Sequence, residues 1–155
     1  MLGDRMLLDT PIGSIGISWR GNMLTGVDLE PDAPSETSKC LPDFIADQLD
    51  AYFHDGAERL DLAVEVQGTR FQHRVWRALR SIPSGRTVTY GELAKQVGGS
   101  ARAVGGACRA NPCPIVVPCH RVVAATGLGG FAGDTSGRKL AVKRWLLRHE
   151  GNELF

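Results

Sequence analysis

The chain has 155 residues and a mass of 16.7 kDa, which suits one domain or two small ones and excludes a large multidomain machine. A hydrophobic content of 43% argues against wholesale disorder, and the lack of any run of about 20 apolar residues excludes a helical membrane span. Residues 1–66 carry 13 acidic and 4 basic side chains, whereas residues 67–155 carry 4 acidic and 14 basic ones. The basic part favours a polyanion such as nucleic acid as partner, although two oppositely charged halves that attract each other would show the same pattern.

The first 67 residues are predicted to form a small α+β domain. Apolar and polar residues alternate over segments joined by tight turns, which predicts an antiparallel sheet with strands near residues 6–8, 15–19 and 23–29. Residues 31–39 are rich in Pro, Ser and Asp and predict a loop. Apolar residues then recur at helical spacing between Pro42 and Gly56, and a further alternation over residues 60–66 predicts one more strand. The start of the chain lacks the basic and apolar regions of a signal peptide, so we expect a cytoplasmic protein.

The second domain, residues 68–155, is predicted to be mainly helical. Phe71, Val75, Trp76 and Leu79 lie on one face of its first helix. Thr89 and Glu92 form a capping box for a helix over residues 90–97, and Ser100 caps the next helix, over residues 101–110. Two short helices joined by a glycine-containing turn predict a helix-turn-helix motif. The fold class is therefore α+β, with an N-terminal antiparallel sheet and a helical C-terminal domain.

The second helix of this motif has an unusually small surface. Its small and basic residues are Ala101, Arg102, Ala103, Gly105, Gly106, Ala107 and Arg109. So small a surface lets the helix axis come close to another backbone, either that of a neighbouring helix or that of DNA. In a segment with this excess of positive charge, DNA is the stronger interpretation.

One cysteine has neighbours that suggest reactivity. The β-branched run Ile115-Val116-Val117 predicts a buried strand that Pro118 ends, so that Cys119 would lie on the turn that follows. His120 and Arg121 come next, and nearby positive charge lowers the pKa of a thiol and raises its thiolate fraction. A buried structural cysteine is the alternative.

Metal binding is a second alternative for this region. Cys108, Cys113, Cys119 and His120 lie close together in the sequence. Structural zinc prefers cysteines separated by about two to four residues on turns, whereas here the first would lie on a helix and the second between two prolines. We therefore expect no metal at these residues, and the lack of a signal peptide favours reduced thiols.

The residues around Cys119 form a long and specific signature. The segment Asn111-Pro112-Cys113-Pro114-Ile115-Val116-Val117-Pro118-Cys119-His120-Arg121-Val122-Val123 resembles the active-site motif of the O6-alkylguanine-DNA alkyltransferases, the methylated-DNA–protein-cysteine methyltransferases. Further segments resemble the same family in the same order, namely residues 71–76, 90–94, 101–105, 129–133 and 143–151. The resemblance covers about residues 69–151 well, and residues 1–68 only in general layout.

The resemblance implies a protein that repairs DNA by direct reversal, acts once, and uses no metal and no organic cofactor. Cys119 takes the position of the nucleophile that accepts the alkyl carbon from guanine O6 in a stoichiometric, irreversible transfer. His120 matches the residue that deprotonates this thiol through a water, and Glu150 the carboxylate that orients the histidine. Tyr90 matches the phenol that assists the departure of guanine, and Asn111 the side chain that braces the turn. From the residues alone, Tyr90 would be a packing aromatic and Asn111 a turn former.

The resemblance also implies how DNA is bound. Arg102 matches the arginine that fills the space left by a flipped base, and the helix that carries it would lie in the minor groove of double-stranded DNA. The alkylated guanine would be enclosed by Pro114, Val122, Gly130, Phe131, Ala132 and Gly133. We expect a monomer that can cluster on DNA.

Two positions depart from the family pattern. Phe131 stands where tyrosine is frequent, and Asp134 follows Gly133 where another glycine is common, so we expect methyl transfer and assign no larger alkyl group.

Two other functions are alternatives to alkyl transfer. A non-catalytic protein that only binds alkylguanine would lack the cysteine that is present here. A Cys–His hydrolase would need an oxyanion hole and would turn over repeatedly.

Overall fold

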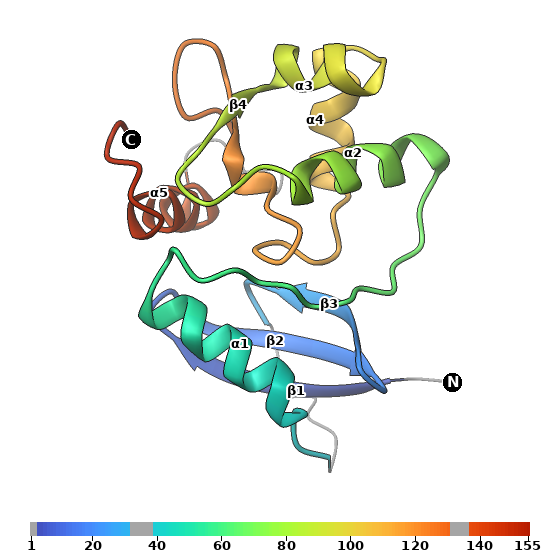
Figure 1. Cartoon of the computed structure of the whole chain (residues 1–155), viewed down its shortest axis with the longest axis vertical. Helices are drawn as coiled ribbons and strands as arrows, with labels where there is room; N and C mark the ends of the chain where they lie inside the picture. Colours follow the sequence, from blue (N-terminus) through green and yellow to red (C-terminus); the bar gives the residue numbers. More distant parts are fainter. Residues whose placement is uncertain (1–2, 32–38, 131–136) are drawn as a thin grey trace. The chain divides into compact units, whose positions relative to one another are not determined.

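The chain divides into two compact units. The computed structural model describes residues 3–31, 39–130 and 137–155 (Figure 1). One unit comprises Met1–Gln67 with Pro112–Val116, and the other comprises Gly68–Asn111 with Val117–Phe155. Residues 112–116 carry no charged side chain, so the first unit has the acidic excess and the second the basic excess of the two parts of the sequence.

The first unit contains the antiparallel sheet that alternation predicts. Its strands are β1 (Asp4–Thr10), β2 (Gly13–Arg20) and β3 (Met23–Asp28), in that order. Ile15, Ile17 and Trp19 of β2 are buried because every second side chain of a strand lies on the same face. Helix α1 (Asp43–His54) buries Ile45, Leu49 and Tyr52 at helical spacing. The sheet and helix predictions are confirmed.

The strand predicted over residues 60–66 is wrong. Only Val64 bridges to another strand residue, Leu24, whose N–H donates to Ala63 O at 2.9 Å while its carbonyl accepts from Glu65 N at 2.7 Å. The alternation instead reflects burial, since Leu62 is 1% exposed and its neighbours on both sides lie at the surface. An extended segment can bury alternate side chains without forming a ladder of backbone hydrogen bonds. Most of the predicted loop, residues 32–38, lies outside the described residues.

The second unit contains the predicted helix-turn-helix motif. Helices α2 (Arg70–Arg80), α3 (Tyr90–Val97) and α4 (Ala101–Arg109) pack against one another (Figure 1). The expected caps are present, and Gly98 ends α3 with φ of 79°, a left-handed conformation that favours glycine. Helix α4 ends at Arg109, one residue before the predicted end, because Ala110 is its cap. Among the described residues, no helix combines the length and apolar character needed to cross a membrane.

The rest of the second unit surrounds a short 3-10 turn, η1 (Cys119–Arg121). The two-residue strands β4 (Val88–Thr89) and β5 (Val122–Val123) pair in parallel, so the backbone after η1 lies beside the start of α3. Helix α5 (Arg138–His149) packs against η1 and buries Val142, Lys143, Leu146 and Leu147. All of the residues predicted for catalysis lie in this unit: Cys119 and His120 in η1, Glu150 at the end of α5, Tyr90 in α3 and Asn111 after α4.

The strand predicted over residues 115–117 is also wrong. These residues are 2–3% exposed, as expected, but they form turns, and Ile115 has φ of 77°. Pro112, Pro114 and Pro118 lack backbone N–H groups and cannot donate to a sheet ladder. Instead, Cys119 N donates to Val117 O at 2.8 Å across a tight turn. The apolar run was a correct indicator of burial and a misleading one of strand structure.

Candidate active site

Cys119 begins the 3-10 turn η1 and is 4% exposed. Burial raises the pKa of its thiol to about 11, although a hydrogen bond from the Asn111 side chain and the charge of Lys143 favour the thiolate. His120 and Arg121, the neighbours whose charge could have lowered this pKa, both bind Glu150 instead. The thiol is held in its protonated form until a base takes the proton.

Asn111 braces the turn that carries Cys119. Its Nδ2 donates to Val117 O at 2.8 Å, and the same carbonyl accepts the backbone N–H of Cys119 at 2.8 Å. Two donors on one carbonyl fix the tight turn before the cysteine. Asn111 also hydrogen-bonds to the thiol, which favours its charged form.

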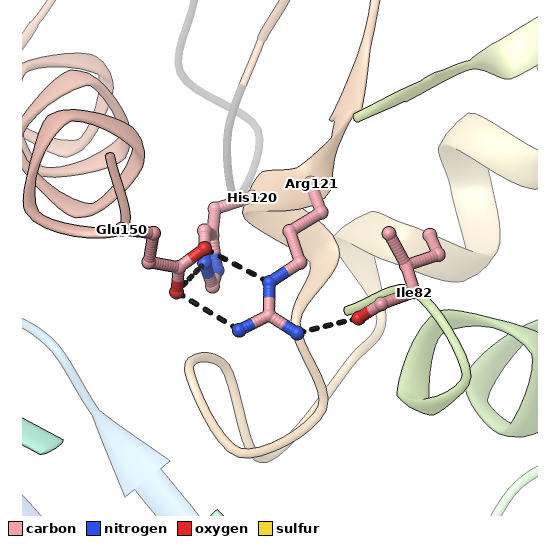
Figure 2. Close-up of polar contacts among 4 residues, drawn as sticks. All are labelled: Ile82, His120, Arg121 and Glu150. Carbon is pink, nitrogen blue, oxygen red and sulfur yellow. Dashed lines mark hydrogen bonds and ion pairs between the residues drawn. The ribbon is translucent and has the colours of Figure 1, made fainter. Parts of the chain in front are cut away.

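His120 and Glu150 form a buried pair (Figure 2). Nε2 of His120 lies 2.8 Å from Oε2 of Glu150, and neither side chain is exposed to solvent. Burial alone would raise the pKa of Glu150, but His120 and Arg121 outweigh it and lower that pKa to about 2. Since an ionised carboxylate only accepts, Nε2 carries the hydrogen and Nδ1 has the free lone pair.

The protonation state of His120 suits a base. Burial lowers the pKa of its ring, which is therefore neutral at pH 7. Nδ1 is buried and has no hydrogen-bond partner in the part of the chain that the structure describes. A neutral ring with an unshared acceptor can take a proton from a nearby thiol.

Arg121 holds the other side of Glu150. Its Nε donates to Oε1 at 2.9 Å and its Nη2 to Oε2 at 3.0 Å, while Nη1 donates to Ile82 O at 2.6 Å (Figure 2). The sequence indicated Arg121 only as a positive neighbour of Cys119. Its partners are distant in the sequence, so no local pattern could reveal them.

Lys143 is a fully buried cation that the sequence analysis missed. Its Nζ donates to Val122 O at 2.7 Å and to Gly130 O at 2.8 Å. Burial lowers its pKa to about 8, while the thiols of Cys119 and Cys108 act in the opposite direction. The available signal was its position beside Val142 and Leu146 on the apolar face of α5.

Tyr90, at the start of α3, lies in the same site. Its hydroxyl donates to Gly130 O at 3.3 Å, and Lys143 Nζ lies 5.9 Å from the ring centroid. Burial and the neighbouring thiols raise the pKa of Tyr90 to about 12, so the phenol keeps its proton and remains a donor. Gly129 has φ of 74°, and a Cβ there would lie 3.2 Å from Cε2 of Tyr90.

The residues predicted to enclose the base are only partly described. Val122 is buried and Gly130 is half-buried, both in the second unit, whereas Pro114 is buried in the first unit. Phe131, Ala132, Gly133 and the departure at Asp134 lie outside the described residues.

Helix α4 exposes most of the residues predicted to meet DNA. Its exposed residues are Ala101, Arg102, Ala103, Gly106 and Arg109, with Gly105 half-buried. Ala107 is 3% exposed, and its carbonyl accepts a hydrogen bond from Trp76 Nε1 at 2.9 Å, so the prediction that it faces DNA is wrong. A Cβ on Gly105 or Gly106 would meet no described atom within 4 Å. Packing inside the unit therefore does not require these two glycines.

None of the four cysteines forms a disulfide. Burial raises the pKa of Cys108 far above its ordinary value. A buried, protonated thiol is a poor nucleophile. Within residues 3–31, 39–130 and 137–155, no three His, Cys, Asp or Glu side chains gather as metal ligands.

Comparisons with known proteins agree on one family. The family model for the DNA-binding domain of 6-O-methylguanine DNA methyltransferase matches residues 70–152. The methylated-DNA–protein-cysteine methyltransferase of Mycobacterium tuberculosis is 42% identical over 141 residues, covering 85% of this chain and 86% of that protein. The crystal structure of Mycobacterium tuberculosis O6-methylguanine methyltransferase has a TM-score of 0.81 at 38% identity, over 96% of this chain and 93% of that one. That of Mycobacterium tuberculosis OGT in complex with DNA has a TM-score of 0.78 at 40% identity, over 95% and 92%.

Fold, site and similarity together define a DNA-binding protein of direct-reversal DNA repair. The chain belongs to the methylated-DNA–protein-cysteine methyltransferases. Its partner is DNA, and its activity is the transfer of a methyl group from methylated DNA to a cysteine of the protein itself.

Proposed function

We propose that Cys119 is the acceptor, and that it takes the alkyl group from O6 of guanine in double-stranded DNA. The thiolate attacks the alkyl carbon, a sulfur–carbon bond forms, and the carbon–oxygen bond breaks with its electron pair left on guanine. The thioether is permanent, so each molecule acts once. The observation that carries this proposal is the buried His120, with Nε2 at 2.8 Å from Glu150 Oε2, directly after the buried Cys119.

The thiol proton passes to His120, through a water, as the sulfur attacks. Nδ1 is the acceptor because Nε2 is already committed to Glu150. Once the ring is positive, the adjacent carboxylate stabilises it at 2.8 Å. Asn111 keeps the turn, and therefore the sulfur, in position.

Tyr90 assists the leaving group. As the carbon–oxygen bond breaks, negative charge gathers on guanine, and a hydrogen-bond donor at O6 lowers the barrier. The phenol already donates to Gly130 O, so an arriving O6 would take the place of this carbonyl as its acceptor. Its raised pKa keeps the donor proton in place.

The target guanine leaves the base stack before it reacts. A thiol that is 4% exposed cannot reach an atom inside the duplex, so the base must be flipped toward the protein. Arg102, in the exposed first turn of α4, would fill the space that the base leaves. The open surface above Gly105 and Gly106 suits close contact with the minor groove, where backbone contacts suffice for repair at any sequence.

We assign different roles to the two units. The second unit contains α4, η1 and α5, so we assign DNA binding and alkyl transfer to it. The first unit contributes none of the proposed reacting groups, and we assign it a supporting role in the fold.

The experiment is to incubate the protein with duplex DNA containing O6-methylguanine and to weigh the intact chain. We expect one addition of about 14 Da per molecule, mapped to Cys119 by peptide analysis and absent in Cys119→Ser. Cys108→Ala, which removes another buried thiol of the same unit, is the matched control and should still be methylated. Product in large excess over protein would indicate turnover and contradict the proposal, and methyl groups on another residue would contradict the assignment of Cys119.

A further inference from the structure

Arg121 is a member of the site to which the transfer just described gives no task. Three of its nitrogens bind defined acceptors: two meet different oxygens of Glu150 and the third meets the carbonyl of Ile82 (Figure 2). A guanidinium is planar and rigid, so this arrangement fixes both the position and the tilt of the carboxylate.

We propose that Arg121 is a positioning residue for the transfer: it aligns Glu150 with His120 and balances the charge of the carboxylate, so that His120 remains a neutral base. This inference rests on the proposed role of His120 as the group that takes the thiol proton.

The first support is the alignment. Arg121 is the last residue of η1, Glu150 caps the end of α5, and Ile82 follows α2. The guanidinium therefore connects three elements of the second unit at one point. Because the 2.6 Å bond to Ile82 O holds the far side of the guanidinium, the carboxylate cannot turn away from His120 without breaking two or more hydrogen bonds.

The second support is the balance of charge. Oε2 of Glu150 is shared, at 2.8 Å from His120 Nε2 and 3.0 Å from Arg121 Nη2. A buried carboxylate with no other cation would draw a proton onto the imidazole, and both nitrogens of the imidazolium would then be donors. Such a ring could take no proton from Cys119. With Arg121 present, the carboxylate already has its countercharge.

The other charges around the ring are few. Glu150 raises the pKa of His120, whereas burial, Arg121 and Lys143 lower it. Glu150 and Lys143 belong to α5 and Arg121 to η1. Helix α2 also packs against η1. In the described part of the chain, no ionisable group of α2 shifts the pKa of His120.

The test is the single-turnover rate of Cys119 methylation between pH 5 and pH 9, for the full chain and for R121M, E150Q and R121M/E150Q. In R121M the uncompensated carboxylate should keep His120 protonated to higher pH, so the acidic limb of the profile should move to higher pH. We expect a rate about tenfold lower at pH 6 and within about threefold of wild type at pH 9. Adding E150Q removes the uncompensated charge and should move the limb back to lower pH.

Two results would overturn the proposal in different ways. If R121M is slowed by the same factor at every pH while the wild type shows an acidic limb, Arg121 has only a structural role and the function of His120 still stands. If neither wild type nor R121M has an acidic limb between pH 5 and pH 9, no imidazole with a raised pKa limits the reaction of the variant, and the role of Arg121 fails. Methylation of Cys119 itself is established separately by peptide mass.

The conservative variant R121K tests the alignment and covers the case in which R121M does not fold. Lysine keeps the positive charge but cannot make all three planar contacts. We expect an acidic limb near its wild-type position and a rate about three- to tenfold lower throughout. A thermal melt confirms folding, and R121K at the wild-type rate at every pH would overturn the positioning role.

Discussion

At the scale of single residues, the central feature of the site is that Cys119 must form a thiolate while it is buried. Burial opposes the charged form of Cys119, so a thiolate forms there only with help from nearby groups. In the proposed transfer, His120 removes the proton, and Lys143 supplies a positive charge that outlasts the proton transfer. The cation itself is buried against two carbonyls, so its charge is poorly screened by solvent.

Replacing Lys143 with Met should slow methylation of Cys119 by about tenfold at neutral pH, because the variant loses a cation that favours the thiolate. The effect should depend on pH. The pKa of Lys143 is lowered to about 8, so the wild type has the charge below that pH and loses it above. We therefore expect the rates of wild type and K143M to converge between pH 8 and pH 10.

The matched control for this prediction is R144M, which removes a cation one position further along α5, on its exposed face. It should react at the wild-type rate. A constant ratio between K143M and wild type across the whole pH range would show that Lys143 acts by holding the carbonyls of Val122 and Gly130, and not by its charge.

At the scale of elements, α4 is built for a partner outside the unit. Glycine inside a helix costs about 1 kcal/mol relative to alanine, yet nothing among the described residues crowds Gly105 or Gly106. The buried side of the same helix, with Val104, Ala107 and Cys108, supplies its packing. The exposed side is therefore the side that we propose for contact with DNA.

Arg102→Ala tests this helix directly. Without a side chain to occupy the gap in the stack, the flipped state of duplex DNA loses stability, so repair of duplex should slow by about tenfold or more. The free base O6-methylguanine needs no flipping, and its reaction with Cys119 should change less than twofold. Equal losses with both substrates would show that Arg102 supports the fold of the site and does not promote flipping.

The sequence predicted elements best where local chemistry decides the backbone. The caps at Thr89 and Ser100 fixed the start of α3 and α4, and the turn between β2 and β3 followed from Gly21-Asn22. It failed at residues 60–66 and 115–117, where apolar side chains are buried without a strand partner. Periodicity reports burial, and only the rest of the chain decides whether a ladder forms.

The same limit explains the site. Cys119, His120 and Glu150 were recognisable because they belong to a long signature, and the structure brings the last two within 2.8 Å. Lys143 was hidden because a lysine on an apolar helix face is usually at the surface. The sequence could not decide whether the neighbours of Cys119 lower its pKa, because adjacent residues need not direct their side chains at one another. Here His120 faces Glu150, and Arg121 faces Glu150 and the carbonyl of Ile82.

At the scale of the whole molecule, the two structural units carry opposite net charges. The unit that contains α4 has the excess of basic residues, and the unit that contains the sheet has the excess of acidic ones. A polyanion is attracted by the unit that contains α4 and repelled by the unit that contains the sheet. DNA affinity should therefore fall steeply as salt rises, since each phosphate contact releases condensed counterions.

Arg109→Ala and Arg59→Ala should separate these contributions. Arg109 is exposed on α4, so its loss should reduce the slope of log Kd against log salt by about 1 and weaken binding several-fold. Arg59 lies in the acidic unit, 86% exposed and 4.0 Å from Asp61, and its loss should leave the slope unchanged. Fluorescence anisotropy with an unmodified duplex, over a salt range of about 50 to 200 mM, measures the slope for each variant. Equal changes in the two variants would mean that DNA responds to the net charge of the chain, and would remove the charge-based reason for assigning DNA contact to α4.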